Sequence, residues 1–178
     1  MKRAAGAALV ALATLLPTGC GSASPGLPGC GATERLGLIA QSVPSAGYLP
    51  CITALPVGWH SSGLLVESGR TQAELTSDRA AGHPVRVRLS AGCDPGPATA
   101  LPPRSPGGRS YLLLSSIAPR YSGMLFDVFP GGCVTYRFDF ARDRHIALMA
   151  ELQSAVGLLA RRQLRLELRR ELGIELGP

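Results

Sequence analysis

Short apolar or alternating segments recur through the middle of the chain, and turn residues separate them. They lie at 63–67, 71–77, 84–90, 111–117, 124–129 and 133–140. The segment at 84–90 is the clearest, because Val85, Val87 and Leu89 alternate with arginine or serine. A period of two places the apolar side chains on one face of a half-buried strand. We therefore expect a hairpin over 71–90 and an antiparallel meander over 111–140.

The hydrophobic period changes in the last third of the chain. Apolar residues spaced by three or four form one stripe, made of Ile146, Met149, Leu152, Val156 and Leu159. This spacing predicts an amphipathic helix over 143–160, with Asp143 at or near its N-cap. The segment 161–172 fits two structures, since its leucines alternate as in a strand and also repeat every four residues as in a helix. Gly173, which suits a left-handed C-cap, favours the helix.

Strands followed by helices predict an α+β fold, a small antiparallel sheet with C-terminal helices packed on one face. Residues 34–50 fit no single element, because prolines and a glycine interrupt a short apolar run. Loops are expected at 51–60, around the only tryptophan, and over the proline- and glycine-rich segment 93–109. A chain of 178 residues predicts one domain, which we place at 34–178.

The chain begins with a positive stretch, Met1-Lys2-Arg3, followed by an uncharged run at 4–16. This run is shorter than the ~20 residues that a membrane-spanning helix needs. The layout is typical of a secretory signal peptide, which we assign to 1–19. The sequence Pro17-Thr18-Gly19-Cys20 resembles the cleavage site of bacterial lipoproteins, where a cysteine follows small residues and leucine usually stands at the position of Pro17. The resemblance implies that Cys20 becomes the mature N-terminus and carries a diacylglycerol.

The residues after Cys20 predict how the domain is held at the membrane. Residues 20–33 are expected to form a lipidated, flexible tether, since 21–29 consist mainly of glycine, serine and proline. The expected location is the outer face of the cell membrane. Two alternatives remain, namely secretion after cleavage behind Ala23 and an uncleaved anchor.

Cysteine usage agrees with export. If Cys20 carries lipid, an even number of cysteines remains, which outside the reducing cytosol predicts two disulfides. We favour the pairs Cys93–Cys133, which would join two strand ends, and Cys30–Cys51, which would fix the N-terminal arm. The cysteines form no short pair with each other or with histidine, so no metal site and no cofactor is expected.

From Cys20 onward the chain has sixteen arginines, no lysine and twelve acidic residues, a net charge of +4. On a helix, Arg161, Arg165 and Arg169 would form one ridge at four-residue spacing. This ridge is either a membrane- or partner-binding surface or a solvated face, and the solvated face is the favoured interpretation. Nucleic acid is not an expected partner, because the protein is exported.

No catalytic motif is visible around the three histidines, His60, His83 and His145. The favoured function is a non-enzymatic interaction module of the cell envelope. It is bound to membrane lipid through Cys20 and recognises another envelope protein, a wall polymer or anionic lipid. The alternative is a lipoprotein that recognises a small ligand or solute in a pocket near Trp59 and the 94–109 loop. A hydrolase that uses His60 or His145 is the weakest of the three hypotheses.

Overall fold

The computed structural model describes residues 25–80, 82–141 and 143–175, with 44% strand against 22% helix. The elements follow one another as α1 (Thr33–Ser42), β1 (Tyr48–Ile52), β2 (Trp59–Glu67), β3 (Arg70–Ser77), β4 (Val85–Ser90), β5 (Thr99–Leu101), β6 (Arg109–Ser116), β7 (Arg120–Phe129), β8 (Gly132–Ala141), α2 (His145–Ala155), β9 (Val156–Ala160) and α3 (Arg161–Leu172).

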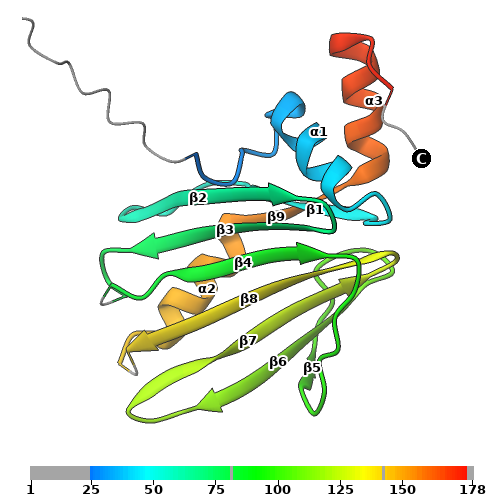
Figure 1. The fold of residues 1–178 in the computed structure, drawn as a ribbon. Coiled ribbons are helices and arrows are strands. Elements are labelled where there is room, and N and C mark those ends of the chain that lie inside the picture. Colours follow the sequence, from blue (N-terminus) through cyan, green and yellow to red (C-terminus); the bar gives the residue numbers. More distant parts are fainter. Residues whose placement is uncertain (1–24, 81, 142, 176–178) are drawn as a thin grey trace, which may run out of the picture.

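Seven strands form one antiparallel sheet in the order β2-β3-β4-β8-β7-β6-β5. The expected hairpin is present as β3–β4, and the expected meander is present as β6–β7–β8. At the centre of the sheet Tyr136 on β8 lies opposite Val87 on β4 and Leu125 on β7. The strand direction turns progressively from β2 to β6 (Figure 1), which is the usual twist of antiparallel sheets.

A long connection carries the chain from β4 to β5 at the far edge of the sheet. Between these two strands in the sheet lie β8, β7 and β6, so the connection must cross three strands. The disulfide Cys93–Cys133 ties the beginning of this connection to the second residue of β8. The short strand β5 then pairs with β6, which gives structure to a segment that the sequence predicted to be a loop.

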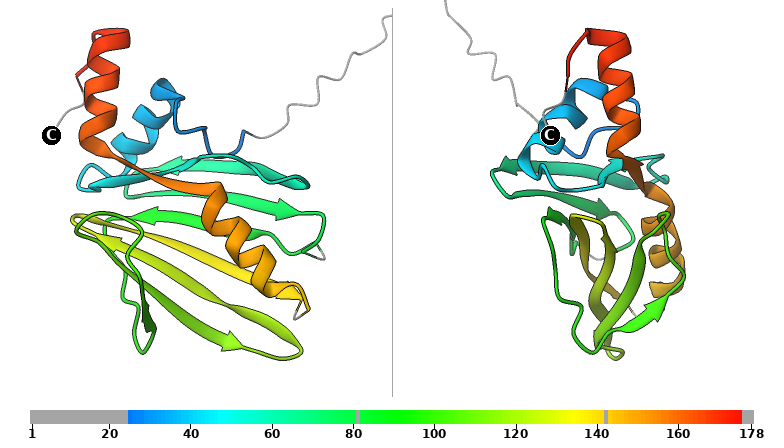
Figure 2. Two further views of the ribbon diagram at one scale, coloured as in Figure 1. Left: turned by 180° about the vertical axis from the view of Figure 1, so that it is seen from behind. Right: turned by 90° about the vertical axis from the view of Figure 1, so that its right-hand side faces the viewer.

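The remaining elements surround the large sheet (Figure 2). Helix α2 lies along one face of the sheet, whereas α1 and α3 stand side by side beyond its β2 edge. Strands β1 and β9 form a separate antiparallel ribbon that leads directly into α3. The second disulfide, Cys30–Cys51, attaches the segment before α1 to β1. Both disulfides have the pairing that the sequence analysis favoured.

The core follows from the alternation that the sequence shows. The apolar side chains of β4 and β8 are buried, while the arginines between them are exposed. Leu148 and Leu152 of α2 pack into the same core, as do Leu164 and Leu168 of α3. Each fully buried side chain of this size contributes ~1.5–3 kcal/mol to folding.

The predicted fold class was wrong. The chain is mostly β, with a seven-stranded sheet rather than a small one, and its helices are short and are not packed together on one face. Besides β5, the sequence did not predict β1, β9 or the start of β2. The start of β2 is polar apart from Trp59, and the apolar run of β9 fits a buried strand as well as a helix.

The predicted helix over 143–160 was correct only in its first part. The helix spans His145–Ala155, and no side chain caps it, so the N-cap role expected for Asp143 was also wrong. Its buried residues are Leu148, Leu152 and Ala155, whereas Ile146 is 76% exposed. Val156 and Leu159 are buried as part of β9 instead, so the predicted stripe is divided between two elements.

The ambiguous segment 161–172 is a helix. It ends at Gly173, whose φ of 66° is left-handed, and the backbone N–H of Ile174 donates to the carbonyl of Leu168 at 3.3 Å. This is the arrangement that glycine favours at a helix C-terminus. Across the helices that the structure describes, none has both the length and the apolar character needed to cross a membrane.

Candidate anion-binding pocket

The first turn of α3 carries positive charge and contains no acidic residue that could neutralise it. Arg161 and Arg162 lie in its first turn and Arg165 follows one turn after Arg161, while that first turn has no acidic residue and no side-chain cap. A helix N-terminus carries partial positive charge, so cations there are unfavourable. Like charges four residues apart, as at 161 and 165, also repel each other. An anion at this end of α3 would relieve both effects.

Arg161 is the buried member of the three. Its guanidinium donates hydrogen bonds to the carbonyls of Ala40 at 2.8 Å and Val43 at 3.4 Å. These carbonyls lie at the C-terminal end of α1, where the helix carries partial negative charge. Burial, and then the charge of Arg165, lower the pKa of Arg161. Arg161 therefore holds α1 and α3 together.

Arg162 and Arg165 are exposed and free to bind. Within residues 25–80, 82–141 and 143–175, no hydrogen bond or ion pair reaches either guanidinium. Together with Arg161 they line an open cleft of about 490 Å³, whose other walls are Gly47, Tyr48, Pro106, Pro130 and Ala160. The cleft thus combines two unpaired guanidinium groups with apolar wall residues, so it could hold an anionic group with a small apolar body.

Connections that are far apart in the sequence meet at this cleft and fix its shape. The N–H of Gly47 donates to the carbonyl of Pro130 at 3.0 Å, and the carbonyl of Gly47 accepts from the N–H of Arg161 at 2.9 Å. Gly131 has a φ of 73°, and a Cβ there would collide with the backbone of Ser45, so the β7–β8 turn requires glycine. The Tyr48 hydroxyl donates to the carbonyl of Pro106 at 3.0 Å. The cleft is therefore built before any ligand arrives.

No protein-family model, no curated protein and no solved structure matches the chain. Its function must therefore be inferred from its own residues.

The predicted ridge of Arg161, Arg165 and Arg169 is divided by the structure. Arg161 is buried and structural, Arg165 lines the cleft, and Arg169 forms an ion pair with Glu175 at 2.8 Å. The residue that joins Arg165 at the cleft is Arg162. The sequence analysis missed this role, because a ridge at four-residue spacing excludes the neighbouring position 162.

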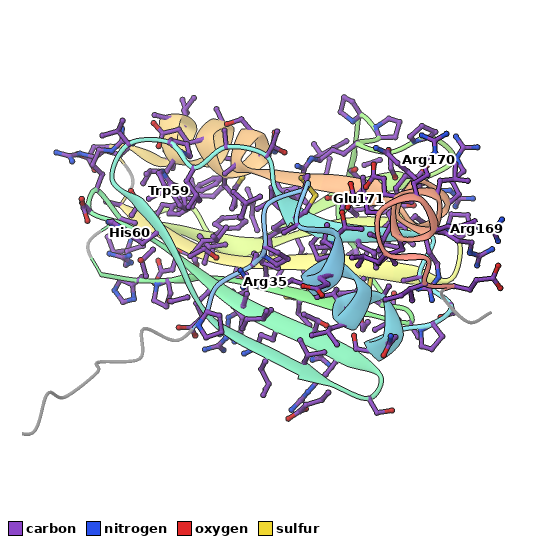
Figure 3. The ribbon with its side chains drawn as sticks, turned by 90° about the horizontal axis from the view of Figure 1, so that it is seen from above. Arg35, Trp59, His60, Arg169, Arg170 and Glu171 are labelled. Atoms are coloured by element: carbon purple, nitrogen blue, oxygen red, sulfur yellow. A yellow bond between two sulfur atoms is a disulfide. The ribbon has the colours of Figure 1, made fainter. Side chains whose placement is uncertain are left out.

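The pocket expected near Trp59 and the 94–109 loop does not combine these two parts. Trp59 is buried, and its indole N–H donates to Glu151 at 2.8 Å, so it belongs to the core. Figure 3 shows Trp59 at the end of the molecule opposite α3. The loop lines a separate cleft of about 450 Å³ with Pro95, Gly107 and Arg109, of which Trp59 is no part.

The histidines lie apart from one another; His60 and His83 are exposed, and His145 is half-buried. His60 is next to Asp78 at 3.7 Å, His83 is 3.9 Å from Asp139, and the ring of His145 packs on Tyr121 at a centroid distance of 4.3 Å. The hydroxyl of Ser61, beside His60 in sequence, accepts a hydrogen bond from the N–H of Leu27 at 2.8 Å. Among the residues described, no group of three or more His, Cys, Asp or Glu side chains could hold a metal ion.

The signal peptide and the lipidation site at Cys20 lie outside the described residues. The described part of the predicted tether, from Pro25 onward, is attached to the domain. Leu27 and Pro28 are buried there, and Cys30 is disulfide-bonded.

Proposed function

We propose that this protein is a lipid-anchored, non-enzymatic binding module at the outer face of a bacterial membrane. The cleft at the start of α3, called the α3 pocket below, binds a phosphate or carboxylate group of a ligand or partner in the envelope. The observation that carries the proposal is the pair of unpaired guanidinium groups, Arg162 and Arg165, at a preformed cleft beside an uncapped helix N-terminus. Anchoring through Cys20 is supported by the signal sequence and its lipoprotein-like end.

Without a bound anion, the positive charges at the α3 pocket repel one another. Three arginines share the start of one helix, and one of them is already buried against α1. A bound anion would accept charge-assisted hydrogen bonds from Arg162 and Arg165, each worth ~1.5–3 kcal/mol. A total of about 4 kcal/mol corresponds to a Kd of about 1 mM for one small anion. A polymer or protein that presents several such groups would bind more tightly.

Calorimetric titration of the domain tests this proposal. Glycerol 3-phosphate and acetate serve as the phosphate and carboxylate probes, and glycerol serves as the neutral one. We expect the wild type to bind at least one anion, with a Kd near 1 mM, about 4 kcal/mol of binding free energy. The double variant Arg162→Gln/Arg165→Gln should weaken that Kd about a hundredfold or more, because each lost charge-assisted contact costs ~1.5 kcal/mol or more.

Arg170→Gln is the control for the single variant Arg162→Gln, because each removes one positive charge. Arg170 is an exposed arginine of the same helix and lies outside the cleft, so its loss changes the net charge without changing the pocket. Equal weakening in the Arg170→Gln variant would show that only the overall charge attracts the anion, and the pocket assignment would then fail.

A further inference from the structure

The end of the tether is held firmly on one edge of the domain. The carbonyl of Pro25 accepts a hydrogen bond from the N–H of Leu64 at 2.7 Å, on the outer edge of β2. The carbonyl of Gly26 accepts one from Arg35 of α1 at 2.8 Å. Further along, Gly29 pairs with Ile52 and Cys30 is bonded to Cys51. The chain therefore leaves the domain at a fixed point between β2 and α1.

The distance from this point to the lipid is limited by the sequence. Cys20 and Pro25 are five residues apart, and five residues span at most about 18 Å even when fully extended. This length is similar to that of a twelve-residue helix such as α3, which rises ~1.5 Å per residue. If Cys20 carries the lipid, the β2 edge and α1 cannot move far from the membrane surface.

Exposed apolar side chains occur on this part of the domain. Leu38 on α1 is 58% exposed, and Val66 on β2 is 38% exposed. They lie near each other, because Ser42, one turn after Leu38, bonds to Thr71 at 2.7 Å, and Thr71 lies opposite Val66 in the sheet. Arg35 adds a positive charge on the same helix, and Figure 3 shows it on the face that is seen from above.

We propose that this face, formed by the exposed side of α1 and the β2 edge, rests on the anchoring membrane, with Leu38 in the interfacial layer and Arg35 near lipid phosphates. The inference rests on the proposed lipid anchor at Cys20 and is independent of the α3 pocket. Apolar and basic side chains are what an interfacial contact needs, although the exposed Glu34 beside Arg35 offsets part of the positive charge. The occupant is the bilayer itself, because a tether of at most about 18 Å keeps this face close to it.

The test uses the full lipidated chain in vesicles of phosphatidylcholine and phosphatidylglycerol that carry bromine in the upper acyl chains. Leu38→Trp places a fluorophore on the proposed face, while Trp59 remains buried and supplies a constant background. The emission of the new tryptophan should fall by roughly half, because an interfacial side chain enters the headgroup–acyl boundary. A long Gly/Ser insertion between Ser24 and Pro25 should restore much of this emission.

Ile117→Trp is the matched control. Ile117 is 61% exposed, close to the value for Leu38, and lies in the β6–β7 turn near the other edge of the sheet. Its emission should be unchanged by bromine. Equal quenching at both positions, or none at either, in a chain whose intact mass includes diacylglycerol would overturn this orientation alone. A mass without diacylglycerol would overturn the anchor, and the orientation with it.

Discussion

Arg104, in the connection between β5 and β6, shows how one side chain can join several parts of the fold. Its guanidinium donates to Asp127 at 2.8 Å and to the carbonyls of Gln153 and Val156 at 2.7 and 2.5 Å. Asp127 is 1% exposed and also accepts from the hydroxyl of Ser110 at 2.7 Å. These bonds join the β5–β6 connection, the sheet and the end of α2. Nothing in the sequence singled out this cluster, because its members are separated by up to 52 residues.

Asp127→Asn should therefore destabilise the fold strongly. Removing one charge of a buried pair leaves the other uncompensated, which costs ~3–5 kcal/mol. Glu74→Gln is the control, since the Glu74–Arg86 pair at 3.2 Å is solvent-exposed and such pairs are worth ~0–1 kcal/mol. Denaturant unfolding of both variants measures the difference, and similar losses in both would show that the cluster is not a structural anchor.

Tyr136 predicts how stability depends on alkaline pH. Its hydroxyl is fully buried and has no hydrogen-bond partner among the described residues. Burial, and then the charge of Asp127, raise the pKa of Tyr136, while Arg104 opposes the shift. The folded state thus keeps the phenol protonated at a pH where the unfolded chain, with a pKa of about 10, ionises. Stability from this group is present below pH ~10 and is lost as the pH rises further.

Tyr136→Phe should remove this alkaline loss. At neutral pH its free energy of unfolding should stay within about 1 kcal/mol of the wild type, because an unpartnered hydroxyl contributes little. Urea unfolding between about pH 8 and 11 compares the two proteins. Parallel curves over that range would show that other groups cause the alkaline dependence.

At the scale of elements, strands with a clean alternation were predictable and elements with mixed signals were not. The segments that form β3, β4 and β8 follow the period of two closely, so these strands could be predicted from the sequence. Helix α2 was assigned the wrong buried side, because its apolar residues outnumber the positions that face the core. Its end was also misplaced, since Val156–Ala160 pairs with β1, a contact over a hundred residues away in sequence.

The stability of two α2 variants tests whether the helix buries the face seen in the structure or the stripe predicted from the sequence. Leu152→Ala should cost ~2–5 kcal/mol, because Leu152 is completely buried and a cavity would remain. Ile146→Ala should change the free energy of unfolding by less than ~0.5 kcal/mol, because Ile146 is exposed. Thermal or denaturant unfolding measures both, and similar losses would mean that α2 buries the predicted stripe after all.

At the scale of the whole molecule, the sequence predicted the two disulfide pairs but not the candidate pocket. The disulfide prediction needed only cysteine number and segment ends. The pocket depends on Tyr48, Pro106, Pro130 and the start of α3, which tertiary contacts bring together. The sequence indicated only the arginine-rich start of 161–172. The shape of the pocket depends on the contact between the β7–β8 turn and β1, which the sequence did not predict.

The most direct test of the central claim is to map the anion onto the domain by NMR. Titration with glycerol 3-phosphate should shift the backbone amides of Arg162 and Gln163 and the side-chain Nε–Hε signals of Arg162 and Arg165, while the amide of Arg170 stays unchanged. Binding at the α3 pocket predicts this localised pattern, since helix N-terminal N–H groups and guanidinium groups are anion ligands. Equal shifts at all exposed arginines, or shifts confined to another face, would contradict it.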